Sequence, residues 1–331
     1  MRALLWVVMA VLCVAGTAHA ADAFSGNGPI PVRNFQPVQL IFLNLPFERA
    51  RVQPRGGLEL HMESAESNEI ATNQDELNAV LKFETNRTVF GGSVGVTDRL
   101  QLGLDVPFVS RYGGFLDPFI DAIESATGTT NPERRLFPQN SFGAFQIRRG
   151  RTTLFHGGVQ YMELGDVWGS AKYALWDQPD WPLVSLRAAV KAPTGRAGAT
   201  FGSGKPDVGA GVAAEQQFLP WLVAYGNFDV IYPTGPITPA RLTLNPFLIE
   251  TVAGEARLWR QLSFLLQQEL YTSPLHGLGT RLLNGTAVEM TAGFKLAVGP
   301  MLVQFGVIDN VSPVATTADF SVLLRLSYRR S

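Results

Sequence analysis

The sequence has a single cysteine, Cys13, among 331 residues. It lies in the uncharged run from Ala3 to Gly16, close to the N-terminus. Beyond that run there is no cysteine, which excludes a disulfide framework, thiolate metal ligands and a cysteine nucleophile. Stability then has to come from ordinary burial of apolar surface or from a lipid bilayer.

Charged residues are also scarce. Asp, Glu, Lys and Arg make up 17% of the chain, and 27 basic against 28 acidic residues leave a net charge of −1. There is no overall positive charge to attract phosphates, so we expect no nucleic-acid partner. With 46% hydrophobic residues, the chain is too apolar to be disordered, which leaves a packed or membrane-embedded fold.

A long hydrophobic run is missing as well. Beyond residue 20, the longest stretch free of charged side chains runs from Asn34 to Phe47, and Pro37 and Pro46 interrupt it. A transmembrane helix needs about 20 apolar residues, so we expect none.

The first twenty residues have the pattern of a signal peptide. Arg2 precedes the apolar run, and the small residues Ala18 and Ala20 form a signal-peptidase site. We therefore predict cleavage after Ala20 and export from the cytoplasm. An uncleaved anchor helix is the alternative, but the run is shorter than a membrane span.

Apolar and polar side chains alternate with period two in several segments of about ten residues. Between residues 183 and 191, Leu186 and Val190 share one face of a strand, and Arg187 and Lys191 share the other. The same alternation occurs in residues 100–108, 287–297 and 320–329. Ten residues is the length of a tilted strand that crosses a bilayer, whereas strands of soluble sandwiches are nearer five or six.

The connections between these segments predict the topology. Five tight turns alternate with six longer loops rich in Gly, Pro and Asn, which gives eleven connections and twelve strands. The sequence thus predicts an all-β fold, a closed antiparallel transmembrane β-barrel with short periplasmic turns and long extracellular loops. The expected strands are residues 57–66, 77–96, 99–110, 165–176, 181–192, 207–218, 221–232, 245–257, 260–272, 286–297, 301–309 and 319–329.

Two of the expected loops lie between residues 67 and 164. Residues 67–76 are expected to form the first loop. Residues 142–161, within the long loop 111–164, form either a hairpin standing above the membrane or two more strands, which would make fourteen.

Several motifs resemble those of a known family. The motif Lys191–Gly195, followed by Gly202–Gly209, is the most distinctive. Further matching motifs are Gly28–Ile30, Arg33–Phe35, Gly113–Asp117, Gly165–Val167 and Ala318–Phe320. The chain resembles an uncharacterised family of proteobacterial outer-membrane barrels, a domain of unknown function, and is similar to barrels described as transporters of a phenol-degradation meta-pathway. This resemblance covers nearly the whole mature chain and implies a barrel, with no catalytic residue.

Charged residues of both signs occupy the positions predicted to face inward. On the lipid side each Lys or Arg at the membrane midplane would cost about 2–4 kcal/mol, so we assign these residues to the lumen. The candidate lumen-lining residues are Glu59, His61, Glu63, Lys82, Glu84, Lys172, Arg187, Lys191, Glu255, Arg257, Glu289, Lys295 and Arg325, together with Asp166, Asp207 and Glu215. Ion pairs between neighbouring strands would narrow the water path.

Motifs for metal, phosphate or catalysis are weak. Glu59, His61 and Glu63 share one strand face, which permits a metal or proton site, but a water-filled lumen explains them equally and we favour that interpretation. The glycine-rich stretch 195–211 lacks a phosphate-binding loop, because Pro206 occupies the position of the magnesium-binding Ser or Thr. We expect no metal, no cofactor and no enzyme activity.

Aromatic residues near the predicted strand ends suggest two interfacial girdles, where rings straddle lipid and water. They are Phe108, Tyr112, Trp176, Trp181, Phe218, Trp221, Tyr232, Trp259, Tyr271 and Tyr328.

Two segments could close the barrel. In the long loop, residues 116, 119, 120 and 123 are apolar at helical spacing, which predicts a short helix capped by Asp117 with Pro118 in its first turn. Phe115, Asp117 and Phe119 would then constrict the barrel mouth, unless the helix merely rests on the loops. The other candidate is the N-terminal segment 21–56, a periplasmic or lumen-plugging segment ahead of the barrel at 57–331.

The leading hypothesis is a passive channel for a small solute, hydrophobic or aromatic solutes included. The alternatives are a closed structural or adhesion barrel and, third, an outer-membrane enzyme that modifies lipid. The expected partners are outer-membrane lipid and, during biogenesis, the barrel-assembly machinery and periplasmic chaperones.

Overall fold

The computed structural model describes residues 24–74, 77–129, 131–177, 182–237, 242–276, 278, 281–311 and 316–330. The predicted signal peptide and its cleavage after Ala20 lie outside these residues. Within them, no helix is long and apolar enough to cross a membrane.

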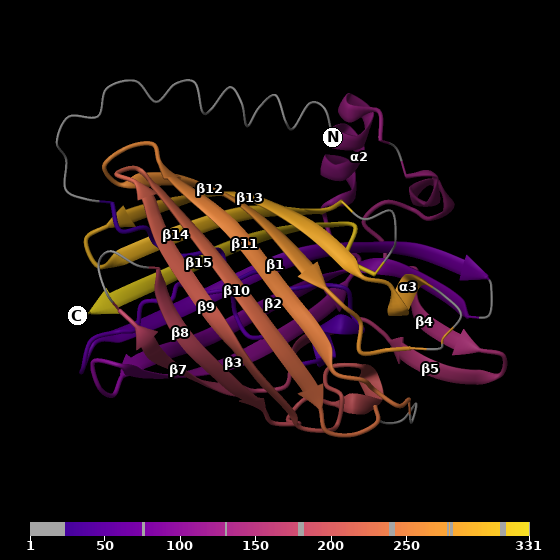
Figure 1. Ribbon diagram of the computed structural model, residues 1–331. Helices are drawn as coiled ribbons and strands as arrows, with labels where there is room; N and C mark the ends of the chain where they lie inside the picture. Colours follow the sequence, from indigo (N-terminus) through magenta and orange to yellow (C-terminus); the bar gives the residue numbers. More distant parts are fainter. Residues whose placement is uncertain are drawn as a thin grey trace.

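Twelve antiparallel strands of the described residues form one closed barrel (Figure 1). They are β1 (Leu58–Gln74), β2 (Asn78–Gly95), β3 (Leu100–Tyr112), β7 (Trp168–Trp176), β8 (Leu183–Lys191), β9 (Asp207–Leu219), β10 (Leu222–Pro233), β11 (Phe247–Arg257), β12 (Leu262–Tyr271), β13 (Ala287–Val298), β14 (Met301–Asn310) and β15 (Phe320–Arg330). The last strand pairs with the first, from Leu58 opposite Arg330 to Asn68 opposite Phe320. The predicted closed barrel of twelve strands is confirmed.

Three further strands add to this wall without enlarging the ring. β6 (Gln160–Leu164) pairs with β3 ahead of β7, and the intervening residues 165–167 are not strand. β4 (Ala144–Arg149) and β5 (Thr152–Gly157) form a hairpin on the outer end of β2, at residues 78–82. Residues 142–161 therefore supply a projecting hairpin rather than two further barrel strands.

The helical elements are short. They are η1 (Gln39–Ile41), α2 (Asp117–Thr127), η2 (Pro132–Leu136), η3 (Ala197–Ala199) and α3 (Arg281–Asn284).

The outer face of the barrel is apolar, as the alternation predicts. On β8, Leu186 is 44% and Val190 is 57% exposed, whereas the neighbouring Ser185 and Arg187 are buried. In water so much exposed apolar surface would promote aggregation, whereas a bilayer covers it.

One expected loop is strand instead. β1 continues to Gln74, and its pairing with β2 runs on from Ser67 opposite Thr85 to Gln74 opposite Asn78. The turn-forming residue types of this stretch suggested a loop, but the backbone pairing outweighs that local preference. The β1–β2 hairpin consequently projects beyond the ring, where β4 extends its sheet (Figure 1).

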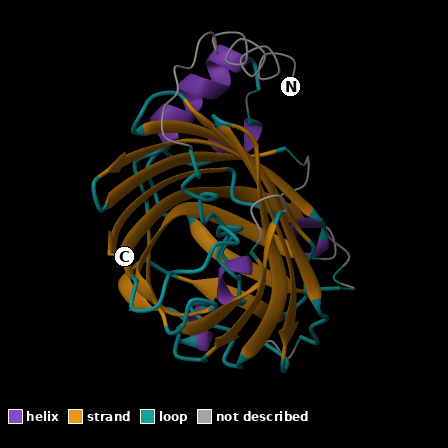
Figure 2. Cartoon of the chain, turned by 60° about the vertical axis from the view of Figure 1, so that its left-hand side comes forward, coloured by secondary structure: helices purple, strands orange, loops and turns teal. Residues whose placement is uncertain are grey.

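The N-terminal segment runs through the barrel interior, where Figure 2 shows non-strand chain enclosed by the strands. Ile30, Phe35 and Phe47 are almost completely buried and belong to one apolar core with Ile249 and Leu265, which point inward from β11 and β12. The expectation of a polar lumen needs correction, because inward apolar positions pack against this segment.

Candidate functional site

The N-terminal segment is anchored to the barrel by partly buried polar contacts. Arg49 donates to Glu215 at 2.5 Å between Nη2 and Oε1, and the backbone N–H of Asn27 donates to Glu255 at 2.8 Å. Glu48 accepts from Lys172 at 2.7 Å. Charges on the wall therefore hold the segment in place.

Lys191 and Arg187 hold the middle of the same segment. The Lys191 ammonium donates to the carbonyl of Ile41 at 2.5 Å and lies 2.8 Å from both Asp166 and Asp207. Arg187 donates to the carbonyl of Pro46 at 2.7 Å. Both cations are hydrogen-bonded to backbone carbonyls of the segment, and Arg187 also lies 3.8 Å from the Glu48 carboxylate.

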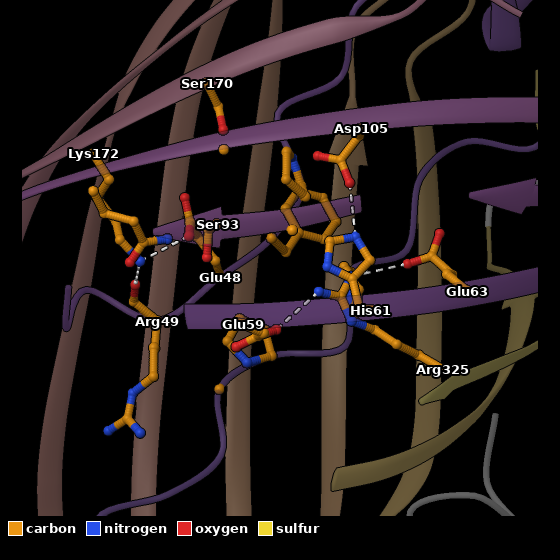
Figure 3. Close-up of a pocket in the computed structure, with 18 of the residues that line it drawn as sticks. Glu48, Arg49, Glu59, His61, Glu63, Ser93, Asp105, Ser170, Lys172 and Arg325 are labelled. Atoms are coloured by element: carbon orange, nitrogen blue, oxygen red, sulfur yellow. Dashed lines mark hydrogen bonds and ion pairs between the residues drawn. The ribbon is translucent and has the colours of Figure 1, made fainter. Parts of the chain in front are cut away.

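A cavity of about 260 Å³ lies between this segment and the wall of β1, β2, β3, β7 and β15 (Figure 3). Its lining includes Glu59, near the start of β1, and Arg329, near the end of β15, so it lies towards the end of the barrel with the short turns. The predicted lumen residues that it brings together are Glu59, His61, Glu63, Lys172 and Arg325.

Ion pairs organise the charges of this cavity. Arg325 bridges Glu59 and Glu63 at 3.2 Å each, and Arg87 donates to Glu63 at 3.3 Å. In Figure 3 the ring of His61 faces Asp105, with 2.7 Å between Nε2 and Oδ1.

The arrangement of His61 gives little support to metal binding or nucleophilic catalysis. Its partner is Asp105, whereas Glu59 and Glu63 pair with arginines. Among the residues that the structure describes, no three metal-ligating side chains are grouped to hold an ion. In the same residues, no serine hydroxyl is hydrogen-bonded to the His61 ring.

Two much smaller cavities continue towards the long loops. One of about 20 Å³ includes Arg33, Arg87 and Phe201 in its lining, and the next, of about 10 Å³, includes Ile41 and Thr200. The interior is therefore widest near the short turns and narrow near the loops.

Arg111 of β3 closes this narrow end. Its guanidinium lies 4.9 Å from the ring centre of Phe145 and 4.2 Å from that of Phe201. It also donates to the carbonyls of Ala199, at 2.7 Å, and Thr200. Cation–π contacts and charged hydrogen bonds thus fix the loop 193–206 against β4.

Lys82 and Glu84 do not lie in the lumen, contrary to prediction. Successive side chains of a strand point to opposite faces. On β2, Phe83 faces the interior core, so the adjacent Lys82 and Glu84 face outward. There the loop 113–143 covers them: Lys82 pairs with Asp117, and Glu84 accepts the backbone N–H of Leu116 at 2.8 Å. The free-energy cost of placing a charge in lipid, on which the prediction was based, does not apply here, because the loop 113–143 shields these two charges from lipid.

The predicted helix exists as α2, but it lies outside the barrel in both Figures 1 and 2. Leu116 and Ile120 pack on Phe320 of β15, and the ring of Phe119 lies 5.8 Å from that of Phe320. Phe115 is 60% exposed. The predicted constriction by Phe115, Asp117 and Phe119 is wrong, because the helix buries its apolar side on the outer wall.

Asp117 is not the helix cap either. Leu116 occupies that position, and the Asp117 carboxylate accepts from Lys82, from Arg134 at 3.1 Å and from the backbone N–H of Asn140 at 2.7 Å. Burial raises the pKa of Asp117, but Lys82 and these other donors outweigh it, so the net shift is downward.

The other predicted lumen residues face inward. Lys295 lies 3.3 Å from Glu255, and Arg257 lies over the ring of Phe24 at 5.5 Å. Glu289 stands opposite Glu269 across β12 and β13, and both are buried.

Sequence reasoning missed several interior residues. Arg87, Trp168 and Arg111 belong to the wall, and Arg33 and Arg49 belong to the N-terminal segment. The alternation of β2 held a signal for Arg87, which is out of phase with Lys82 and Glu84. No such signal exists for Arg33 and Arg49, because the N-terminal segment has no regular alternation of polar and apolar residues.

Most of the predicted girdle aromatics are exposed at strand ends, including Trp176, Phe218 and Trp259. Tyr271 is an exception, since it is buried and its ring lies 6.2 Å from that of Phe47. Trp181 lies outside the described residues.

The fold and its apolar outer face define a membrane-spanning β-barrel whose interior is largely filled by its own N-terminal segment. The chain belongs to the family described as "Protein of unknown function (DUF3187)", whose sequence profile matches residues 3–330. The predicted membership of an uncharacterised outer-membrane barrel family is thereby confirmed.

The chain is also similar to solved structures of channels. The COG4313 outer-membrane channel from Pseudomonas putida F1 is 11% identical, with a TM-score of 0.58 over 87% of this chain and 100% of that chain. The CymD monoaromatic hydrocarbon channel is 12% identical, with a TM-score of 0.41 over 90% of this chain and 91% of that one. No curated protein is significantly similar in sequence.

Proposed function

We propose that the protein is a passive outer-membrane channel for a small solute. The observation that carries this proposal is the cavity of about 260 Å³ inside a closed membrane-spanning barrel. A barrel that served only as a rigid support would gain stability from filling such a space, since buried apolar contacts are lost around a void.

The path follows the β2–β3–β7 side of the interior. It begins in the large cavity, passes Arg87 and Trp168, and continues through the two small cavities to the loop 193–206. Transport requires this narrow part to widen. The N-terminal segment is the element that moves, because polar tethers such as Arg49–Glu215 can open without breaking the strand pairing of the wall.

Planar-bilayer recording of the purified mature protein tests this function. We expect discrete conductance steps in KCl, and a higher open probability for Arg49→Ala, which removes the ion pair between the segment and Glu215 of β9 and the hydrogen bonds from Arg49 to the Ser25 and Gly26 carbonyls. Arg55→Ala is the matched control, because Arg55 is exposed and does not line the interior cavities. Folded protein that neither conducts nor admits solutes into liposomes would exclude a channel and favour a closed structural barrel.

We also propose that the protein is exported with a signal peptide that is cleaved after Ala20. Cleavage after Ala20 would deliver a mature chain beginning at Ala21, with folding assisted by periplasmic chaperones and the barrel-assembly machinery. N-terminal sequencing of protein from the outer-membrane fraction tests the cleavage site, and a start at Met1 would contradict it.

A further inference from the structure

Four buried residues form the junction between the large cavity and the first small one. Arg33, Asn44, Arg87 and Trp168 line both cavities, and each is at most 8% exposed. The junction thus contains two guanidinium groups and an indole N–H, and no carboxylate lines both sides of it.

Two donors at this junction have no acceptor. The Nε–H of Arg33 and the Nε1–H of Trp168 are buried and make no hydrogen bond to the described part of the chain. The Asn44 oxygen also has no partner, so its side-chain amide can rotate to present either its NH₂ or its oxygen. A buried donor without an acceptor is costly, which makes an acceptor supplied from outside favourable.

The neighbouring arginine is also short of negative charge. Arg87 has Glu63 as its carboxylate partner, at 3.3 Å, and its guanidinium lies 5.2 Å from the ring centre of Trp168. That glutamate is shared with Arg325.

The electrostatics of the wider cavity agree with this. Burial, followed by the positive charge of Arg87, lowers the pKa of Arg33 to about 9. Seven Arg and Lys side chains line the large cavity against four carboxylates. A negative group placed at the junction would relieve both the repulsion between the two guanidinium groups and the excess of positive charge.

We propose that this junction binds the carboxylate of a small organic acid, whose remaining part lies in the large cavity. A carboxylate accepts paired hydrogen bonds from a guanidinium, and the indole N–H supplies a further donor beside it. Val52, Val89 and Phe47 offer apolar contacts to the rest of the molecule. A cavity of about 150 Å³ holds benzene, so about 260 Å³ is enough for a benzoate-sized acid.

This inference deepens the proposed channel function, since the bound acid would be the solute that passes through. Binding itself does not depend on conduction, so the two claims can fail separately.

Calorimetric titration of the mature protein in detergent, with benzoate as the probe, tests the site. Benzamide is the neutral analogue of the same shape, and acetate carries the charge without the ring. We expect benzoate to bind at least about tenfold more tightly than benzamide, because a charged hydrogen bond contributes more than a neutral one. Acetate is expected to bind more weakly than benzoate, since it lacks the apolar contacts.

Two variants probe the junction. Arg87→Gln should weaken benzoate binding about tenfold or more, and Trp168→Phe, which keeps an aromatic ring, should weaken it about two- to tenfold. Arg55→Gln removes the same charge from an exposed residue outside the cavity and should leave binding unchanged. Circular dichroism establishes that each variant retains its β-structure.

The outcomes separate the two proposals. Equal binding of benzoate and benzamide, or equal benzoate affinity for Arg87→Gln and Arg55→Gln, would overturn the carboxylate site even if the protein conducts KCl. Benzoate binding that is lost in Arg87→Gln, in a protein without conductance, would support the site and reject the channel.

Discussion

Removal of Arg187 should destabilise the barrel more than any exposed charge does. Its side chain is 1% exposed and lies against Asp229 on β10, which is itself fully buried. The same guanidinium donates to Asn227 at 2.6 Å and to the carbonyl of Pro46 at 2.7 Å. Arg187 therefore joins β8, β10 and the N-terminal segment at one point.

The size of the effect follows from the charge left behind. Arg187→Ala leaves the Asp229 carboxylate inside the barrel without its ion-pair partner, and breaking a buried pair from one side costs about 3–5 kcal/mol. The loss of hydrogen bonds to Asn227 and Pro46 adds about 1 kcal/mol each. Replacing both partners by apolar residues of similar volume, as in Arg187→Met with Asp229→Leu, removes the unpaired charge and should restore more than half of the loss.

Equilibrium unfolding by urea in lipid vesicles, followed by tryptophan fluorescence, measures these differences. A loss of less than about 1 kcal/mol for Arg187→Ala would contradict this assignment, because an unpaired buried carboxylate costs more than that. A double variant as unstable as Arg187→Ala would show that the unpaired Asp229 carboxylate is not the cause of the loss.

Further predictions concern the wall, the outer face and α2. Gly293→Ala should cost about 1–3 kcal/mol, because the added carbon would lie 2.4 Å from the Phe305 carbonyl oxygen, whereas Gly254→Ala has open space and should be neutral in the same unfolding assay. Leu186→Arg puts a charge on the lipid face of β8 and should cost about 2–4 kcal/mol, while Leu186→Ile should have little effect. The pKa of Asp117 is lowered, so its contribution to docking α2 is fully present above the usual value of about 3.9 and lost as the pH falls through the lowered pKa. Proteolysis of the loop 113–143 should accelerate in that acidic range, and Asp117→Asn should accelerate it at neutral pH. If the wild-type loop at acidic pH and the variant loop at neutral pH are both cleaved no faster than the wild-type loop at neutral pH, Asp117 does not have the assigned role.

Strict alternation made the barrel wall predictable from sequence. In β8, each inward residue from Ser185 to Lys191 is polar or small and each outward residue is apolar, so register and orientation follow from the pattern. In β2, polar residues occur at both phases: Lys82 and Glu84 lie on one face and Arg87 on the other. The inward face of β2 cannot be chosen without knowing that the loop 113–143 docks on the outer wall. No local sequence pattern predicts that docking.

The site was predictable only in part, for a related reason. Glu59, His61 and Glu63 were found because β1 alternates. Arg87, which pairs with Glu63, and the junction residue Trp168 were not assigned to the interior. Arg33 lies in a segment without a regular period. The position of that segment depends on contacts with residues far along the chain, which a local pattern does not reveal.

The threaded N-terminal segment also sets the order in which the molecule can be built. Ile30 is hydrogen-bonded to Gln267 and Asn27 to Glu255, partners that lie 237 and 228 residues further along the chain. These contacts can therefore form only after β11 and β12 have been synthesised, and until then the apolar side chains of the segment have no barrel interior in which to pack. Contacts between residues so distant in the chain form slowly, so we expect docking of the N-terminal segment to be a late step in folding.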